Sequence, residues 1–190
     1  MTVCVAVMDA THVAIAADGR SVNQGGTIVA EETRKVLRFG QMIVAAAGEQ
    51  GLINEWHHAL DQVATDELTP RVPARLAREL CRQECTTPFD GAGMPTAWDL
   101  TAVIATAQGI WRFSYGGMLC PVVGSCYAIG SGAEAARGAV EAMKVLEASW
   151  PAGKWPLPSA ALLATLAAMA ACRVDSACGG SVHAVSLARG

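Results

Sequence analysis

The chain opens with the run Thr2-Val3-Cys4-Val5-Ala6-Val7-Met8 and, after the turn-like Asp9-Ala10-Thr11, the run Val13-Ala14-Ile15-Ala16-Ala17-Asp18. The two short apolar runs within these stretches, Val3–Met8 and Val13–Ala17, lie on either side of the turn and predict a β-hairpin. Asp18 ends the second run, where a buried charge is costly unless a partner compensates it, so we expect it to be paired. The opening therefore combines a buried hairpin with a charge that needs a partner.

Thr2 stands directly behind Met1. If the methionine is removed, one residue carries both a hydroxyl nucleophile and a free α-amine, whose pKa is about 8 in model compounds. A hydroxyl with its own amine as general base is a complete nucleophilic pair. Threonine is common at this position, so the feature is weak alone and the rest of the chain has to decide.

Further along, the hydrophobic pattern alternates between strands and pairs of helices. The expected strands cover residues 35–39, 42–47, 100–106, 110–114, 122–123, 127–129 and 181–187, and the expected helices cover 49–66, about 73–85, 131–148 and 159–173. Polar, glycine-containing loops are expected before residue 35 and over residues 86–98. Two antiparallel sheets between helix pairs would bury strands on both faces, which explains their lack of clean alternation. The predicted fold class is α+β, a four-layer αββα sandwich.

Composition limits the possible functions. With 190 residues, 52% apolar and 16% charged, we expect one domain over residues 1–190 that buries part of its surface against copies of itself. A formal net charge of −3 gives no reason to expect binding to nucleic acid or to a membrane. Seven cysteines without a C-x-x-C pair, and no signal-like N-terminus, favour reduced thiols in the cytoplasm and argue against a zinc site. We expect no metal and no cofactor.

Several polar signals stand at the ends of the predicted elements. Asp18 ends a strand, Lys35 begins one, and Gly48 lies between a strand and a helix, where an N–H could meet an oxyanion. Gly130-Ser131-Gly132 forms a turn before a helix, and Asp175-Ser176-Ala177-Cys178-Gly179-Gly180 forms a polar turn before the last strand. Each has an ordinary alternative, such as a structural ion pair, a helix N-cap at Ser131 or a small buried hydrophobe at Cys178.

Taken in order, these motifs resemble the proteasome β-subunit family, and especially its bacterial heat-shock-locus V peptidase (HslV) branch. Five motifs are similar to the family's motifs and occur in the same order along the chain. They are the opening hairpin, Lys35-Val36, Ala46-Ala47-Gly48, Ala128-Ile129-Gly130-Ser131-Gly132 and the turn at residues 175–180. The mixture of motifs also resembles a divergent side branch, the betaproteobacterial proteasome homologues (BPH). The resemblance implies the N-terminal nucleophile (Ntn) hydrolase fold and a threonine-type endopeptidase.

The resemblance also implies roles for individual residues. Thr2 would be the nucleophile, with its own α-amine handling the proton. Lys35 would lower the cost of forming the alkoxide, and Asp18 would keep Lys35 oriented and charged. The Gly48 N–H would stabilise the tetrahedral oxyanion.

Further residues would support this centre or bind substrate. Ser131, Asp175 and Cys178 would position the α-amine and its water. The backbone of Arg20, Ser21 and Val22 would pair with an extended substrate. Ala46 would shape a specificity pocket together with the Gly48 turn.

Two positions depart from the family pattern. Cys178 stands where proteasome β-subunits have serine, and a thiol is a poorer hydrogen-bond partner. Aligning Lys35 requires one extra residue in the preceding loop, and without that insertion Arg34 would take its place. We favour Lys35 because Val36 follows it and the strand begins there.

The resemblance implies self-assembly into two stacked rings of six or seven identical subunits, acting on unfolded proteins or peptides. An ATP-dependent unfoldase could feed such a ring, and the sequence does not show whether one exists. Residues 86–98 would then lie near the axial pore. Two alternatives stay open: a non-catalytic ring subunit, and an Ntn amidase that acts on a small molecule.

Overall fold

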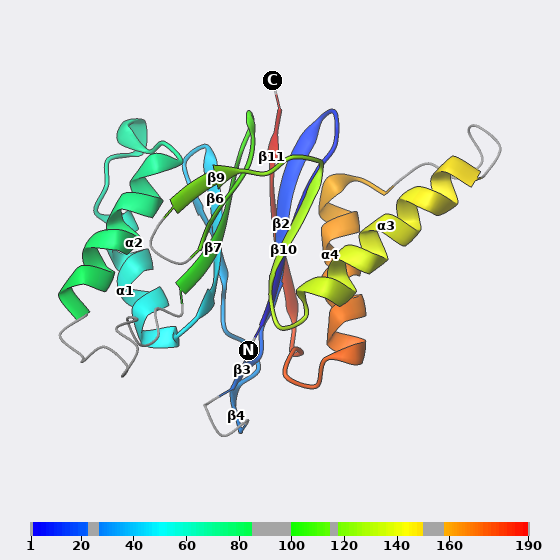
Figure 1. The fold of residues 1–190 in the computed structure, drawn as a ribbon, viewed down its shortest axis with the longest axis horizontal. Coiled ribbons are helices and arrows are strands. Elements are labelled where there is room, and N and C mark those ends of the chain that lie inside the picture. The colour runs from blue at the N-terminus through cyan, green and yellow to red at the C-terminus, as the bar shows by residue number, and fades with distance from the viewer. Residues whose placement is uncertain (1, 23–26, 85–99, 115–117, 150–157, 190) are drawn as a thin grey trace, which may run out of the picture.

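The computed structural model describes residues 2–22, 27–84, 100–114, 118–149 and 158–189. Two antiparallel sheets form its centre (Figure 1). The four-stranded sheet has the order β10-β1-β2-β11, with β10 at Cys126–Gly130, β1 at Val3–Met8, β2 at His12–Asp18 and β11 at Val182–Ala188. The five-stranded sheet runs β5-β6-β7-β8-β9, at Val36–Phe39, Met42–Gly48, Leu100–Thr106, Gly109–Ser114 and Met118–Pro121.

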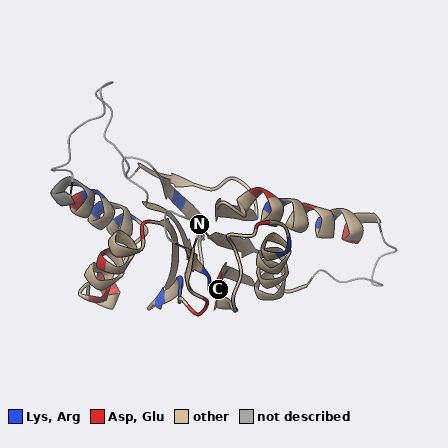
Figure 2. Ribbon diagram, turned by 90° about the horizontal axis from the view of Figure 1, so that it is seen from below, with Lys and Arg blue, Asp and Glu red and all other residues tan. Residues whose placement is uncertain are grey.

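Helix pairs cover the outer faces of both sheets. The helices α1 (Gln50–Asp61) and α2 (Arg71–Glu84) lie on the five-stranded sheet, and α3 (Ala133–Ser149) and α4 (Ala160–Val174) lie on the four-stranded sheet (Figure 1). The layers therefore follow the order α, β, β, α, and the predicted αββα architecture is confirmed. The outer helices carry many charged residues, while the strands are largely uncharged (Figure 2).

Three hydrophobic layers separate these four layers of structure. Because neighbouring side chains of a strand point to opposite faces, Val3, Val5 and Val7 of β1 pack against α3 and α4, whereas Cys4 and Ala6 pack between the sheets. The strand β6 divides its residues in the same way. Both faces of these central strands are apolar, which is why the sequence lacks polar alternation.

Alanine sets the spacing on the α4 side. The buried face of α4 is alanine at five of its six positions: Ala160, Ala164, Ala167, Ala168 and Ala171, with Leu163 as the sixth. Alanine is the strongest helix former, and its small side chain lets the helix axis approach the sheet closely. This helix therefore holds β1 and β2 in place from outside.

Most boundaries lie within two residues of the prediction, and two elements differ by more. The first helix ends at Asp61, five residues before the predicted end, and a short 3₁₀ turn follows at Thr65–Glu67. A strand at residues 122–123 was predicted wrongly: β9 ends before them, at Pro121, and the chain turns at Gly124, whose φ is 107°.

The loop before Lys35 is also more ordered than predicted. It contains a two-stranded antiparallel pair, β3 (Ser21–Val22) and β4 (Ile28–Ala30). The predicted loop over residues 86–98 lies outside the described residues. Among the described residues, no helix combines the length and apolar character that a membrane span requires. That residues 1–190 form one domain stays a prediction.

Four strand termini meet at one end of the four-stranded sheet. In the antiparallel register, Val3 lies opposite Gly130, Cys4 opposite Ala17, and Val182 opposite Asp18. The start of β1, the end of β2, the end of β10 and the start of β11 are therefore neighbours. The N-terminal end and the β3–β4 pair lie on this side (Figure 1).

Candidate active site

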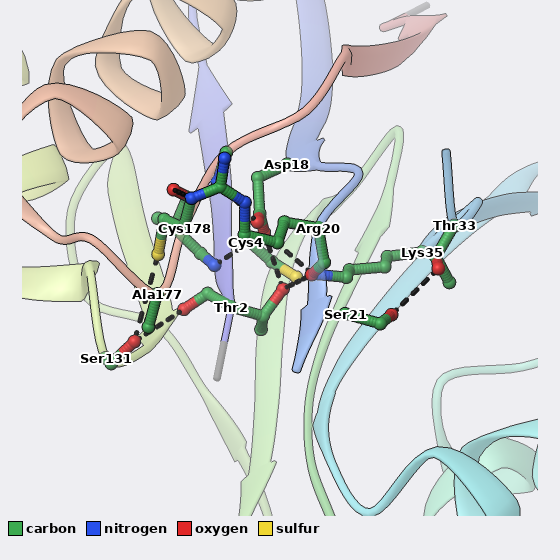
Figure 3. Close-up of polar contacts among 12 residues, drawn as sticks. Thr2, Cys4, Asp18, Arg20, Ser21, Thr33, Lys35, Ser131, Ala177 and Cys178 are labelled. Carbon is green, nitrogen blue, oxygen red and sulfur yellow. Dashed lines mark hydrogen bonds and ion pairs between the residues drawn. The ribbon is translucent and has the colours of Figure 1, made fainter. Parts of the chain in front are cut away.

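Thr2, Asp18 and Lys35 form a buried hydrogen-bonded group at this end of the four-stranded sheet (Figure 3). Their exposed fractions are 4%, 0% and 6%. The Thr2 hydroxyl donates to Asp18 Oδ1 at 2.6 Å, and Lys35 Nζ donates to both the Thr2 Oγ1 and Asp18 Oδ1, the latter at 2.9 Å. The hydroxyl therefore lies between a carboxylate and an ammonium group.

Asp18 is held by four donors. Besides Thr2 and Lys35, the Val3 N–H donates to Oδ1 at 2.9 Å and the Gly179 N–H donates to Oδ2 at 3.0 Å. A fully buried carboxylate is stable only when it is paired and hydrogen-bonded, and this one is both. The predicted partner of Asp18 is thus found, along with a backbone donor from the distant turn at Gly179.

Lys35 uses all three of its donors within this group. Its third hydrogen bond goes to the backbone carbonyl of Arg20 at 2.5 Å. The neighbouring Arg34 is exposed, so the structure brings Lys35 rather than Arg34 to Thr2. A positive charge at the hydroxyl would stabilise the alkoxide that a nucleophilic attack requires.

The carbonyl of Thr2 is anchored on the turn between β10 and α3. It accepts from the Gly132 N–H at 3.4 Å and from the Ser131 hydroxyl at 3.5 Å. Gly130 has φ 91°, and a Cβ there would lie 2.0 Å from the Thr2 carbonyl oxygen. Only glycine permits this close approach, which explains the Gly130-Ser131-Gly132 turn.

Ser131, Asp175 and Cys178 converge beside the Thr2 backbone. The Cys178 thiol donates to Asp175 Oδ2 at 3.2 Å and lies 3.8 Å from Ser131 Oγ. A hydrogen bond from Ser131 lowers the pKa of Asp175, and bonds from the Ala177 N–H and Cys178 act in the same direction. Burial, with the Asp175 hydrogen bond, raises the pKa of Cys178 to about 12. The Cys178 thiol therefore stays neutral and donates its hydrogen bond to Asp175.

Gly48 and Ala46 lie on the neighbouring sheet. Cys4 Sγ donates to the Ala46 carbonyl at 3.6 Å, which brings β1 and β6 together two residues from Thr2 and from Gly48. Gly48 is the exposed last residue of β6, with φ 140°, and Glu49, the N-cap of α1, follows it. The role of Gly48 as an oxyanion donor stays a prediction. The Ala46 side chain is 1% exposed and packs in the layer under α1 and α2. Its role in a pocket stays a prediction.

The three predicted substrate-contacting residues differ in their contacts. Ser21 and Val22 form β3, whose only neighbour among the described strands is β4, so its other edge is unpaired there. Arg20 instead uses its N–H to bond the Gly179 carbonyl at 2.9 Å and its own carbonyl to accept from Lys35. A substrate contact at Arg20 would have to displace these bonds, and it stays a prediction.

Sequence reasoning missed three contributors to the site. Gly179 donates to Asp18, Cys4 links the two sheets, and Glu31 pairs with Arg20. The glycine-rich turn was visible in the sequence without its target, and a glutamate in a polar loop carries no local signal. Within the described ranges, no three His, Cys, Asp or Glu side chains are grouped as a metal ion would require.

Comparisons with solved structures show which proteins share the fold of this chain. BPH of Thiobacillus denitrificans has a TM-score of 0.75 in its complex with epoxomicin, at 18% identity over 100% of both chains. A second structure of that protein has a TM-score of 0.73, at 18% identity over 100% of this chain and 99% of that one. A eukaryotic HslV, from Trypanosoma brucei, reaches 0.70 at 17% identity over 98% of this chain and 99% of that one.

At these identities the three structures establish a shared fold. No curated protein matches the chain. The model of the proteasome subunit family matches residues 2–149, well over half of the sequence. The chain therefore belongs to the proteasome subunit family.

Proposed function

We propose that this chain is a threonine-type endopeptidase in which Thr2, freed by removal of Met1, is the nucleophile. One observation carries the proposal: the Thr2 hydroxyl is buried and hydrogen-bonded to both Asp18 and Lys35. A hydroxyl that served only packing would not need an ion pair at its oxygen, because burying two charges costs several kcal/mol of desolvation free energy per ion.

The proposed reaction passes through an ester. The Thr2 hydroxyl gives its proton to the free α-amine as Oγ1 bonds to the carbonyl carbon of the scissile peptide. The oxyanion that forms is stabilised by the Gly48 N–H, and Lys35 stabilises the alkoxide character of Oγ1. The carbon–nitrogen bond then breaks and the amine returns the proton to the leaving nitrogen. A water molecule hydrolyses the ester and restores the hydroxyl.

The groups around the α-amine would hold Thr2 in the orientation that the reaction needs. The Thr2 carbonyl is anchored by Gly132 and Ser131, which limits rotation of the residue that carries both nucleophile and base. Asp175, Cys178 and Ser131 form a small polar network beside it, suited to hold the amine and a water. An extended substrate would add to the unpaired edge of β3.

The proposal includes assembly into two stacked rings in the cytoplasm. Exposed apolar residues on α3 and α4 support a contact between copies of the chain through these two helices. They are Val145, Leu146, Leu162, Leu166 and Met169. Unfolded proteins or peptides would be the substrates. An unfoldase partner stays an open prediction.

A peptidyl epoxyketone tests the mechanism, because this warhead reacts with both the hydroxyl and the free amine of one N-terminal residue. Epoxomicin, which is bound in one of the similar BPH structures, is a suitable probe. Intact mass should show loss of Met1 and one adduct per chain. Thr2→Ala should give no adduct, whereas Thr2→Ser, which keeps a hydroxyl and an amine, should still react.

Three results would contradict the proposal. These are retention of Met1 in the purified protein, absence of an adduct on the trimmed chain, and an unchanged adduct on Thr2→Ala. A trimmed, folded and assembled protein without an adduct would favour the non-catalytic ring subunit instead. Hydrolysis of small amides but not of peptides would favour the amidase.

A further inference from the structure

The side chain of Arg20 is committed to the turn that supports the site. Its Nη1 donates to the carbonyls of Ser176 at 2.8 Å and Cys178 at 3.2 Å. A Cβ at Gly179 would lie 2.5 Å from the guanidinium carbon, so the turn packs directly on Arg20. This side chain therefore fixes the turn from which the Gly179 N–H reaches Asp18.

Glu31 holds the other side of the same guanidinium. Arg20 Nε lies 3.2 Å from each Glu31 carboxylate oxygen, and Nη2 lies 3.1 Å from Oε1. A planar guanidinium that meets a carboxylate through two nitrogens has a defined orientation, unlike a single contact. The contacts with Glu31 orient the guanidinium so that its Nη1 points toward the turn.

The backbone around Glu31 is placed just as closely. Cβ atoms built at Gly19 and Gly180 would lie 2.7 Å and 2.1 Å from the Glu31 carbonyl oxygen. The Thr33 N–H donates to the Gly19 carbonyl at 2.8 Å. The backbone of Glu31 therefore packs between Gly19, which follows β2, and Gly180, in the turn that precedes β11.

We propose that Glu31 is a positioning residue that acts through Arg20 to hold the turn at residues 175–179, and that it thereby sets the rate of the chemical step. The proposal rests on the function proposed above. The turn positions two sets of groups near Thr2. The Gly179 N–H donates to Asp18, and the hydrogen-bonded pair Asp175 and Cys178 lies beside Thr2. Glu31 itself touches none of the reacting atoms.

The size of the effect follows from exposure. The Arg20 and Glu31 side chains are 22% and 44% exposed, so water and salt weaken their attraction. Because partly exposed ion pairs contribute little, loss of this pair should slow the chemical step only about two- to five-fold. Because the site's own ion pair is buried, salt should act on this outer pair first.

The decisive variant is Glu31→Gln, which keeps the shape of the side chain and removes its charge. Glu32→Gln is the matched control, because Glu32 is the adjacent, exposed glutamate. With epoxomicin as probe, Glu31→Gln should lower the first-order rate of adduct formation about two- to five-fold and leave the initial binding constant unchanged. The wild-type rate should fall with added salt, and this dependence should weaken in Glu31→Gln.

Amide hydrogen exchange tests the same proposal without relying on activity. Peptides that contain residues 175–180 should exchange faster in Glu31→Gln than in wild type or Glu32→Gln, with exchange in β6 unchanged. Glu31→Asp, which keeps the charge, should restore part of the protection and part of the rate.

The outcomes separate the two proposals. If the wild-type protein forms no Thr2 adduct, the peptidase function is refuted, and the rate-setting role of Glu31 with it. If the adduct forms but Glu31→Gln matches Glu32→Gln in rate and exchange, only the Glu31 proposal is wrong. A change in the binding constant alone would also overturn it, because Glu31 would then act on substrate rather than on the turn.

Discussion

Replacing His57 by phenylalanine is expected to make folding stability less sensitive to acid. His57 lies on α1 with an exposed fraction of 9%, and its ring centroid is 5.3 Å from that of Trp56. Its Nε2 atom has no hydrogen-bond partner within the described part of the chain. Burial lowers the pKa of His57 from 6.5 to about 4, although the nearby Asp61 acts in the opposite direction.

The sign follows from which state binds the proton. The unfolded chain protonates His57 near pH 6.5 and the folded chain only near pH 4, so acid favours unfolding between these values. This lowering of the pKa corresponds to about 3 kcal/mol of folding free energy once the pH is below both values. Between pH 7 and pH 5, about 2 kcal/mol of the free energy of unfolding should be lost through this group.

Urea unfolding at pH 7 and pH 5 measures this loss. The free energy should fall by about 2 kcal/mol less in His57→Phe than in wild type, at one fixed protein concentration so that assembly contributes equally. His58→Gln is the control, because His58 is the exposed neighbour on the same helix. Equal acid sensitivity in wild type and His57→Phe would refute the assignment of a buried neutral histidine.

Three further substitutions test the site itself. Asp18→Ala should abolish the epoxomicin adduct and lower the free energy of unfolding by about 3–5 kcal/mol, because Lys35 would be left buried without its partner; near-wild-type denaturant stability would contradict this. Gly130→Ala should displace the start of β1, since its Cβ would overlap the Thr2 carbonyl, with a loss of at least about 2 kcal/mol by thermal unfolding; an unchanged melting temperature would be the contrary result. Cys178→Ser should speed adduct formation about two- to five-fold, because a hydroxyl is the stronger donor; a slower variant would show that the thiol is preferred.

Much of the architecture was predictable because its determinants are local. Strands β1 and β7 match the predicted ranges, since apolar runs between turn residues are short-range signals. The end of α1 and the position of β9 were predicted wrongly. Both errors lie at boundaries, where the glycine turn and the packing against neighbours matter more than the hydrophobic pattern.

The sequence by itself determined the inventory: a threonine behind a methionine, a lysine and an aspartate at strand ends, and three glycine-containing turns, in the order of one family. Only the tertiary structure decided which of these groups meet. Thr2, Asp18 and Gly179 come together because antiparallel pairing brings the start of one strand beside the end of the next. Lys35 reaches them from the position just before β5 in the other sheet, so its contact depends on how the two sheets pack together. Glu31 joins them through Arg20, a contact between a loop and a turn that are far apart in the sequence, and such contacts depend on packing in three dimensions rather than on any local pattern.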